Sequence, residues 1–122
     1  MYIQLRDLEV YKLSRELSVI AWDIYSIMSW QAQKIVGEQF VRSTDSMGAN
    51  IAEGYGRFHY LDKVKFYYNA RGSYIESIHW IELIEERKLA DPKLILEYKR
   101  IIQALGPKLN KLITATKSNI SK

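Results

Sequence analysis

Cations and aromatic rings alternate in one part of this sequence, and such a mixture could bind nucleic acid. The run contains Arg57, Phe58, His59, Tyr60, Lys63, Lys65, Phe66, Tyr67, Tyr68 and Arg71. Cations neutralise phosphates and rings stack on bases, so the pattern is typical of nucleic-acid binding. A solvated row of cations above a buried aromatic core explains the same run, and both interpretations stay open at this point.

A second basic group lies near the C-terminus, where residues 91–117 contain only two carboxylates. Its cations are Lys93, Lys99, Arg100, Lys108, Lys111 and Lys117. The net charge of +4 permits a nucleic acid or an acidic partner, and solvated lysines are the alternative. From both groups we take eight candidate nucleic-acid-binding residues: Arg57, Lys63, Lys65, Arg71, Lys99, Arg100, Lys108 and Lys111.

The sequence offers little for catalysis. Its only histidines are His59 and His79, and the Glu-x-x-His pattern of di-metal bundles occurs once, at Glu76 to His79. A di-metal bundle needs two such patterns and further carboxylates. Gly54-x-Gly56 lacks the lysine and hydroxyl residue of a phosphate loop, and the absence of cysteine excludes thiol catalysis. We therefore expect no enzyme, no catalytic residue, no metal and no cofactor.

A small polar stretch, residues 46–57, contains glycine or alanine at every fourth position: Gly48, Ala52 and Gly56. On a helix, these residues form one smooth stripe against which another helix packs closely. Gly54 and Gly56 are expected to supply the left-handed or strained dihedral angles that end the helix.

Polar residues beside this stripe must find partners if they are buried. Asn50 and Glu53 lie three residues apart, on one helix face. We expect a polar cluster of Asn50, Glu53, Ser73 and Glu76 that fixes the register of two helices. Within it, Glu53 is predicted to accept hydrogen bonds from Ser73 or Arg71.

The hydrophobic spacing is helical throughout and predicts the elements that must position these residues. Four helices are expected over residues 7–28, 32–55, 61–88 and 91–117, with short connections. They favour an all-α, antiparallel up-down-up-down four-helix bundle that forms a single domain over residues 1–122. No apolar run approaches the length of a membrane span and no signal segment is evident, so we expect a cytoplasmic protein without membrane contact.

Local signals refine this prediction. Asp7 is expected to cap the first helix, and Trp30 to close one bundle end as an apolar plug. Asp91 and Pro92 should begin the last helix, in which the Gly106–Pro107 pair predicts a kink rather than a break.

The third helix is expected to be apolar on more than one face, which hints at a subunit interface. Its main apolar positions, expected in the core or in an interface, are Val64, Tyr68, Ile75 and Ile78. Additional apolar residues that widen this stripe are Tyr67, Tyr74, Ile81 and Ile84.

Two sequence blocks resemble those of a known family. Residues 46–57 contain Asn-Ile-Ala-Glu-Gly, and residues 66–76 place an aromatic residue before Ala-x-Gly-Ser and a glutamate. Both are similar to the bacterial "four helix bundle protein" family, which includes proteins encoded in intervening sequences of large-subunit ribosomal RNA genes. Asp7 to Lys12 also resembles the start of this family. Tyr74 and the Gly106–Pro107 pair depart from the usual family pattern.

This resemblance implies an antiparallel bundle that forms homopentameric rings. A relative, the accessory variability determinant of diversity-generating retroelements, is a basic pentameric barrel that associates with reverse transcriptase and nucleic acid. We therefore expect a non-enzymatic homo-oligomer that binds RNA or DNA through basic residues. The alternatives are an interaction adaptor for a protein partner and, less favoured by the available ligands, a metal or cofactor enzyme.

Overall fold

The computed structural model describes residues 3–120, which form helices and no strands. The long helices are α1 (Glu9–Ser26), α3 (Glu38–Tyr55), α4 (Tyr60–Glu86) and α5 (Pro92–Lys117). A 3-10 turn, η1 (Leu5–Asp7), precedes α1. Helix α2 (Trp30–Ala32) and a π-helical turn, η2 (Gln33–Gly37), lead into α3 without a break, so these three segments form one rod.

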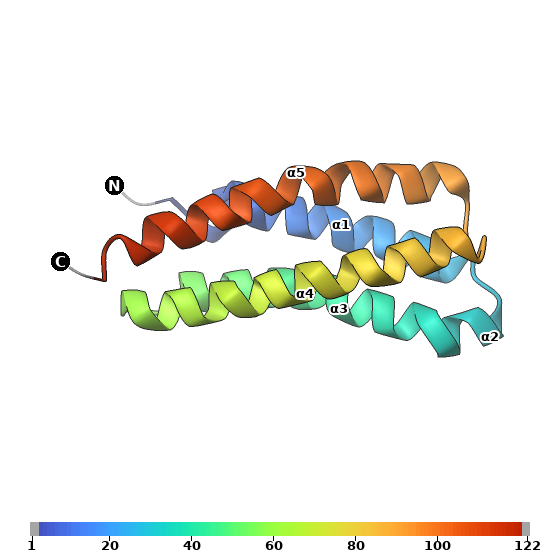
Figure 1. The fold of residues 1–122 in the computed structure, drawn as a ribbon, viewed down its shortest axis with the longest axis horizontal. Coiled ribbons are helices and arrows are strands. Elements are labelled where there is room, and N and C mark those ends of the chain that lie inside the picture. Colours follow the sequence, from blue (N-terminus) through green and yellow to red (C-terminus); the bar gives the residue numbers. More distant parts are fainter. Residues whose placement is uncertain (1–2, 121–122) are drawn as a thin grey trace.

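The four rods form an antiparallel bundle, as the sequence predicted (Figure 1). α1 and α4 lie diagonally opposite each other, and each packs against both α3 and α5. The chain termini lie at the same end as the α3–α4 turn, and we call this the terminal end. The α1–α2 and α4–α5 connections lie at the other end, which we call the loop end. No helix among the described residues is long and apolar enough to span a membrane.

The core follows the predicted positions of α1 and α5. Val10, Leu17 and Ile24 are buried on α1, and Leu105 and Leu109 are buried on α5. Its aromatic centre is formed by Phe40 and Tyr98, whose ring centroids lie 4.9 Å apart. Burial of one continuous stripe on each of these helices holds the bundle together.

Helix α4 carries apolar residues on two faces, and one of these faces lies in the core. Val64, Tyr67 and Ile81 are buried, whereas Tyr68 and Ile75 face outward and are exposed. All five belong to the apolar positions predicted for this helix, so the structure divides the predicted stripe between the core and the surface. Both faces of α4 carry apolar residues, so periodicity alone does not identify the inner one.

Serine pairs join α3 to α4. Ser73 Oγ donates to Ser46 Oγ at 2.9 Å, and Ser77 Oγ donates to Ser43 Oγ at the same distance. Asn50 Nδ2 donates to Ser46 Oγ at 3.0 Å. Ser46 therefore links Asn50 to Ser73, and these short side chains let the two helices approach closely while their polar atoms stay bonded.

The two carboxylates expected in this cluster lie outside it. Glu53 forms an ion pair with Arg57, 2.9 Å away in the turn that follows α3, so the predicted bond from α4 to Glu53 is wrong. Glu76 accepts a hydrogen bond from Trp80 Nε1 at 2.9 Å. Both carboxylates are exposed and satisfied locally, and neither fixes the register of α3 against α4.

The glycines of residues 46–57 do not form one contact stripe, because Gly48 and Gly54 face different helices. A Cβ on Gly48 would lie 3.0 Å from Ser14 Oγ of α1, and a Cβ on Gly54 would lie 2.7 Å from the Tyr67 ring of α4. Gly56 is exposed, and Ala52 is half-buried. No described glycine has a positive φ, so the expectation of left-handed angles at Gly54 and Gly56 is wrong, although α3 ends here with Gly56 as its C-cap.

The starts of three helices can be compared with the predicted ones. Asp7 lies in η1, and the residue that caps α1 is Leu8. Trp30 begins α2 and is 72% exposed, so it does not plug the bundle end. Asp91 caps α5 as predicted, because its Oδ1 accepts a bond from Lys93 N at 2.9 Å. Helix α5 continues through Pro107 without a break.

Candidate nucleic-acid interface

The α3–α4 turn positions the first candidate residues at the terminal end. The Arg57 guanidinium lies 4.7 Å from the centroid of the Phe66 ring and is paired with Glu53, yet its side chain remains 45% exposed. The next residue, Phe58, is 88% exposed. A ring left in solvent beside a cation is an arrangement on which a base can stack.

Lys63 has a structural role in this turn. Its Nζ donates to the carbonyl oxygens of Tyr55 at 2.8 Å and of Gly54 at 3.4 Å. These are among the last carbonyls of α3, where a cation is favoured by the helix dipole. Partial burial lowers the pKa of the Lys63 ammonium. Lys63 is therefore engaged with the backbone and is poorly placed to contact phosphates.

Two candidate lysines on α5 form ion pairs with neighbouring helices. Lys99 Nζ lies 2.6 Å from Glu85 of α4, and Lys108 Nζ lies 3.2 Å from Glu9 of α1. Both pairs are partly exposed, so each contributes little to stability. Their charge is already balanced by a neighbouring carboxylate, which weakens the attraction of these lysines for a phosphate.

The other four candidates are exposed, and within residues 3–120 none of them forms an ion pair. They are Lys65 and Arg71 on α4, and Arg100 and Lys111 on α5. Lys65 and Lys111 lie in the half of the bundle that contains the termini, whereas Arg100 lies in the other half. The structure therefore does not gather all eight candidates into one site.

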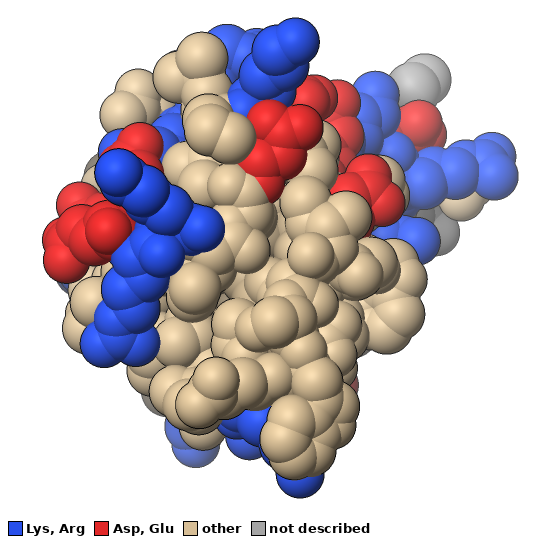
Figure 2. All heavy atoms as spheres, turned by 90° about the vertical axis from the view of Figure 1, so that its right-hand side faces the viewer, with Lys and Arg blue, Asp and Glu red and all other residues tan. Residues whose placement is uncertain are grey.

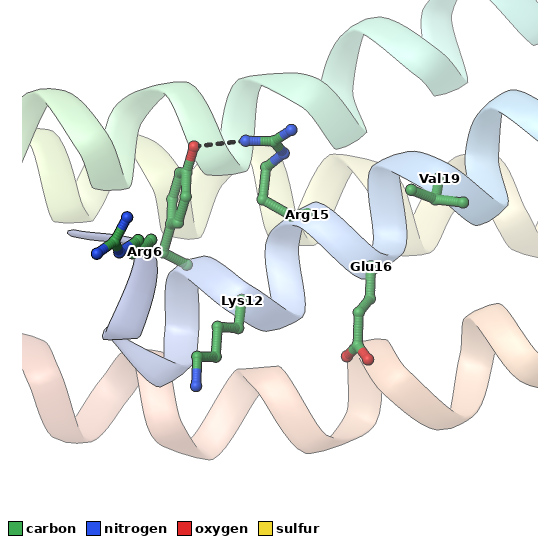
Figure 3. A pocket seen from close by; sticks show the side chains of 6 residues that line it. Arg6, Lys12, Arg15, Glu16 and Val19 are labelled. Atoms are coloured by element: carbon green, nitrogen blue, oxygen red, sulfur yellow. Dashed lines mark hydrogen bonds between the residues drawn. The ribbon is translucent and has the colours of Figure 1, made fainter. Parts of the chain in front are cut away.

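Three further cations, which the sequence analysis did not select, surround a shallow hollow on α1 (Figure 3). Arg6, Lys12 and Arg15 line this hollow of about 390 Å³ together with Tyr11. Arg15 donates a hydrogen bond to the Tyr11 hydroxyl at 2.8 Å, and Lys12 extends from the other side of the helix (Figure 3). Lys12 and Arg15 lie three residues apart in the sequence, which places them at neighbouring positions on a helix surface. This spacing was a sequence signal for a pair of adjacent cations.

A second hollow lies between α1 and α5, next to the first. Lys108 and Lys111 line it from α5, and Leu8 and Glu9 line it from the start of α1. The two hollows flank the same turns of α1, because Lys12 belongs to the first and Glu9 to the second. We call Arg6, Lys12, Arg15 and Lys111 the α1–α5 basic surface.

Charge is divided along the length of the bundle. In the terminal half (residues 3–16, 46–71 and 105–120), cations outnumber carboxylates. These cations are Arg6, Lys12, Arg15, Arg57, Lys63, Lys65, Arg71, Lys108, Lys111 and Lys117. In the loop half (residues 17–45 and 72–104), carboxylates are in excess. The terminal half therefore carries the positive potential of the molecule.

The described residues do not assemble a recognisable catalytic or metal site. No group of three or more His, Asp or Glu side chains in residues 3–120 is arranged to hold a metal ion. His59 lies edge-on to Phe58, and His79 lies edge-on to Trp80. Every buried side-chain nitrogen and oxygen in this range has a hydrogen-bond partner.

Comparisons with known proteins agree with this fold. No curated protein matches the chain. A solved structure from Bacteroides thetaiotaomicron, described as a protein of unknown function from the S23 ribosomal protein family, superposes with a TM-score of 0.76. It is 23% identical, and the match covers 85% of this chain and 97% of that one, which shows a shared fold. The family described as 23S rRNA-intervening sequence protein matches residues 6–111, and the chain belongs to this family.

Proposed function

We propose that this protein is a non-enzymatic, self-associating helical scaffold that binds RNA or DNA through the basic surface of its terminal half. The uneven distribution of charge along the bundle supports this proposal, because the terminal half contains more cations than carboxylates. The intervening-sequence family to which the chain belongs adds a connection with ribosomal RNA genes.

The α1–α5 basic surface is the part best suited to phosphates. Arg6, Lys12 and Lys111 are exposed and form no ion pair within residues 3–120, and Arg15 is bonded only to a neutral phenol. Exposed Phe58 at the same end can stack on an unpaired base. Contacts of this kind bind the sugar–phosphate backbone and depend little on sequence.

Salt dependence tests the proposal directly. We would measure the affinity of the protein for a 23S ribosomal RNA hairpin, a single-stranded RNA and a DNA duplex by fluorescence anisotropy, at several salt concentrations. Because each neutralised phosphate releases counterions, the logarithm of the association constant should fall linearly with the logarithm of salt concentration. Absent or salt-insensitive binding to all three probes would contradict the proposal.

A matched pair of variants locates the surface. Lys12→Gln, Arg15→Gln and Lys111→Gln together should reduce the slope of the salt dependence by about 2 to 3, since each lost phosphate contact removes about 0.7 to 0.9. Lys34→Gln, Lys88→Gln and Lys93→Gln remove the same charge from the loop half and should leave the slope nearly unchanged. Equal losses in both variants would show an effect of net charge alone.

Self-association is the second part of the proposal. Exposed apolar side chains on α1 and α4 support it, including Trp22 and Tyr68. Homopentamers are the form that the family resemblance implies for this chain. The mass of the assembly in solution, measured by light scattering and native mass spectrometry, tests that number, and a monomer at every concentration would contradict it.

An adaptor for a protein partner is the alternative function, and the loop end favours it. Figure 2 shows a broad uncharged area at this end of the molecule. Ile27, Trp30 and Ile35 are exposed there. Contiguous exposed apolar surface of this kind is typical of protein-binding sites. A partner that co-purifies after nuclease treatment, and is lost in Trp30→Ser but retained in Val19→Ser, would favour the adaptor over the nucleic-acid scaffold.

A further inference from the structure

Helix α4 carries a second row of contact positions on the side away from the core. Leu61, Tyr68 and Ile75 recur every seven residues and are 68%, 42% and 55% exposed. Lys65, Gly72 and His79 lie between and beyond them, so the spacing alternates between four and three residues. We call these six residues the outer seam of α4.

The spacing of the outer seam is that of a helix in a coiled coil. Apolar residues at intervals of seven, with a second set four residues later, form the face that meets a partner helix. The opposite side of α4 already packs on the bundle through Tyr67, Ala70 and Ile81. The outer seam is therefore additional to the core. Leu61 and Ile75 are exposed, whereas Tyr68 accepts a hydrogen bond from Lys117 Nζ of α5 at 3.2 Å, and the same ammonium lies 5.8 Å from the centroid of its ring.

Gly72 lies at the centre of the outer seam and leaves open space there. A Cβ at residue 72 would meet no atom within 4 Å, in contrast to Gly54 and Gly106, which are crowded by neighbouring tyrosines. Glycine in the middle of a helix is destabilising relative to alanine. Its place at the centre of an apolar seam leaves room for a large side chain from another helix.

The charges along α4 determine which orientation a partner helix must have. Lys65 and Arg71 lie in its N-terminal half, and Glu76, Glu82 and Glu86 lie in its C-terminal half; all are exposed. A second α4 in parallel orientation would place like charges side by side. In antiparallel orientation, the basic half of each helix meets the acidic half of the other.

We propose that the outer seam of α4 packs antiparallel against the outer seam of α4 in a second copy of this chain. In the register that aligns the heptads, Ile75 of each copy packs over Gly72 of the other. The same register sets Lys65 level with Glu82 of the other copy, and Tyr68 level with His79. The contact is isologous, so each pairing occurs twice about one two-fold axis.

The self-complementary charge pattern favours a second copy over an unrelated helix, since the same helix supplies both the basic and the acidic half. The inference goes beyond the nucleic-acid proposal and does not depend on it. It also differs from ring formation, because an isologous contact joins copies in pairs, whereas a ring of five requires head-to-tail contacts. If copies also form a ring through other faces, contacts between the outer seams of α4 would join two such rings.

Cysteine cross-linking tests the register, because the chain contains no cysteine of its own. Gly72→Cys and Ile75→Cys variants are purified separately, mixed in equal amounts and oxidised. The mixed disulfide should exceed the disulfides within either variant by about tenfold, because only residues that face each other reach disulfide geometry. Leu96→Cys, an exposed position on α5, is the control and should form no specific cross-link.

Mass measurements test whether the seam holds the copies together. Ile75→Asp should reduce the mass of the assembly about twofold, since it places a carboxylate on the two-fold interface. Leu96→Asp introduces the same charge at an exposed leucine away from the seam and should leave the mass unchanged. Circular dichroism of both variants shows whether each remains folded.

Three results would overturn the proposal. Disulfides that form mainly within Gly72→Cys alone and within Ile75→Cys alone would show parallel packing. A folded Ile75→Asp variant with the mass of the unmodified protein would show that the seam is not an interface. A cross-link that appears only with a co-purified foreign protein would assign the seam to a different partner.

Discussion

Tyr74 of α4 lies directly against Gly106 of α5. A Cβ at residue 106 would lie 2.8 Å from Tyr74 Cζ, well inside van der Waals contact, and the phenol oxygen is closer still. The tyrosine ring occupies the space that a side chain at residue 106 would fill.

The contact predicts a coupling between these two positions. In a Tyr74→Leu background, Gly106→Ala should stabilise the protein by about 1 kcal/mol, because alanine is the better helix former. In the unmodified background, the clash with Tyr74 should cancel that gain. Chemical denaturation of the four proteins in the cycle should give a coupling energy of about 1 to 2 kcal/mol. Additive effects would show that the Tyr74 ring moves aside freely.

Gly54 predicts a larger effect, because its neighbour cannot move. The Tyr67 ring is fully buried against it, and the Lys63 carbonyl oxygen lies 3.1 Å from the position of a Cβ. Gly54→Ala should lower the free energy of unfolding by about 1 to 3 kcal/mol through overpacking. Gly56→Ala is the matched control, because its Cβ would approach only carbonyls of its own helix, at 3.5 Å or more. Equal thermal stability of the two variants would contradict this account.

The fold was predictable where a helix has one apolar face. On α1 and α5, residues such as Val10, Leu17 and Leu105 repeat at helical spacing and are buried, because each of these helices contacts the core on one side. Asp91 and Pro92 likewise mark the start of α5 through local chemistry alone. On α4, Tyr68 and Ile75 belong to the same apolar spacing as the buried Val64 and yet are exposed, since a helix with two apolar faces gives no local signal for the inner one.

Side-chain partners were less predictable because they depend on how the helices are placed. Glu53 has a cation four residues away in the turn that follows α3 and another candidate on α4, and only the structure shows that it pairs with Arg57. Lys63 resembles any exposed lysine in the sequence, yet it bonds the end of α3. In both cases, tertiary contacts determine the partner of the side chain.

Alkaline pH should weaken the fold through Tyr67. Burial, with a smaller contribution from Tyr55, raises the pKa of Tyr67 from 10.0 to about 12. The folded state therefore holds this proton more tightly than the unfolded state does. The resulting stability is complete below pH 10 and is lost as the pH rises through 12.

Denaturation at several pH values tests this prediction. Between pH 10 and 12, the free energy of unfolding should fall by up to about 1.4 kcal/mol per pH unit from this group alone. Tyr67→Phe should show a shallower fall over the same range. Burial also raises the pKa of Tyr98, so part of the pH dependence should persist in that variant. An unchanged slope in Tyr67→Phe would assign the effect to other groups.

Lys63 and Lys111 should separate stability from binding. Lys63→Met removes the bonds to the carbonyls of Gly54 and Tyr55 and should cost about 1 kcal/mol of stability, the scale of a cation at a helix C-terminus. Its affinity for an RNA hairpin should change little, because the ammonium is engaged with the backbone. Lys111→Met, at an exposed position without an ion pair in residues 3–120, should leave stability within about 0.5 kcal/mol and reduce affinity at low salt.

The comparison needs two measurements on each variant, thermal unfolding for stability and fluorescence anisotropy for affinity. If Lys63→Met lost affinity while remaining as stable as the unmodified protein, the lysine would belong to the phosphate-binding surface rather than to the end of α3.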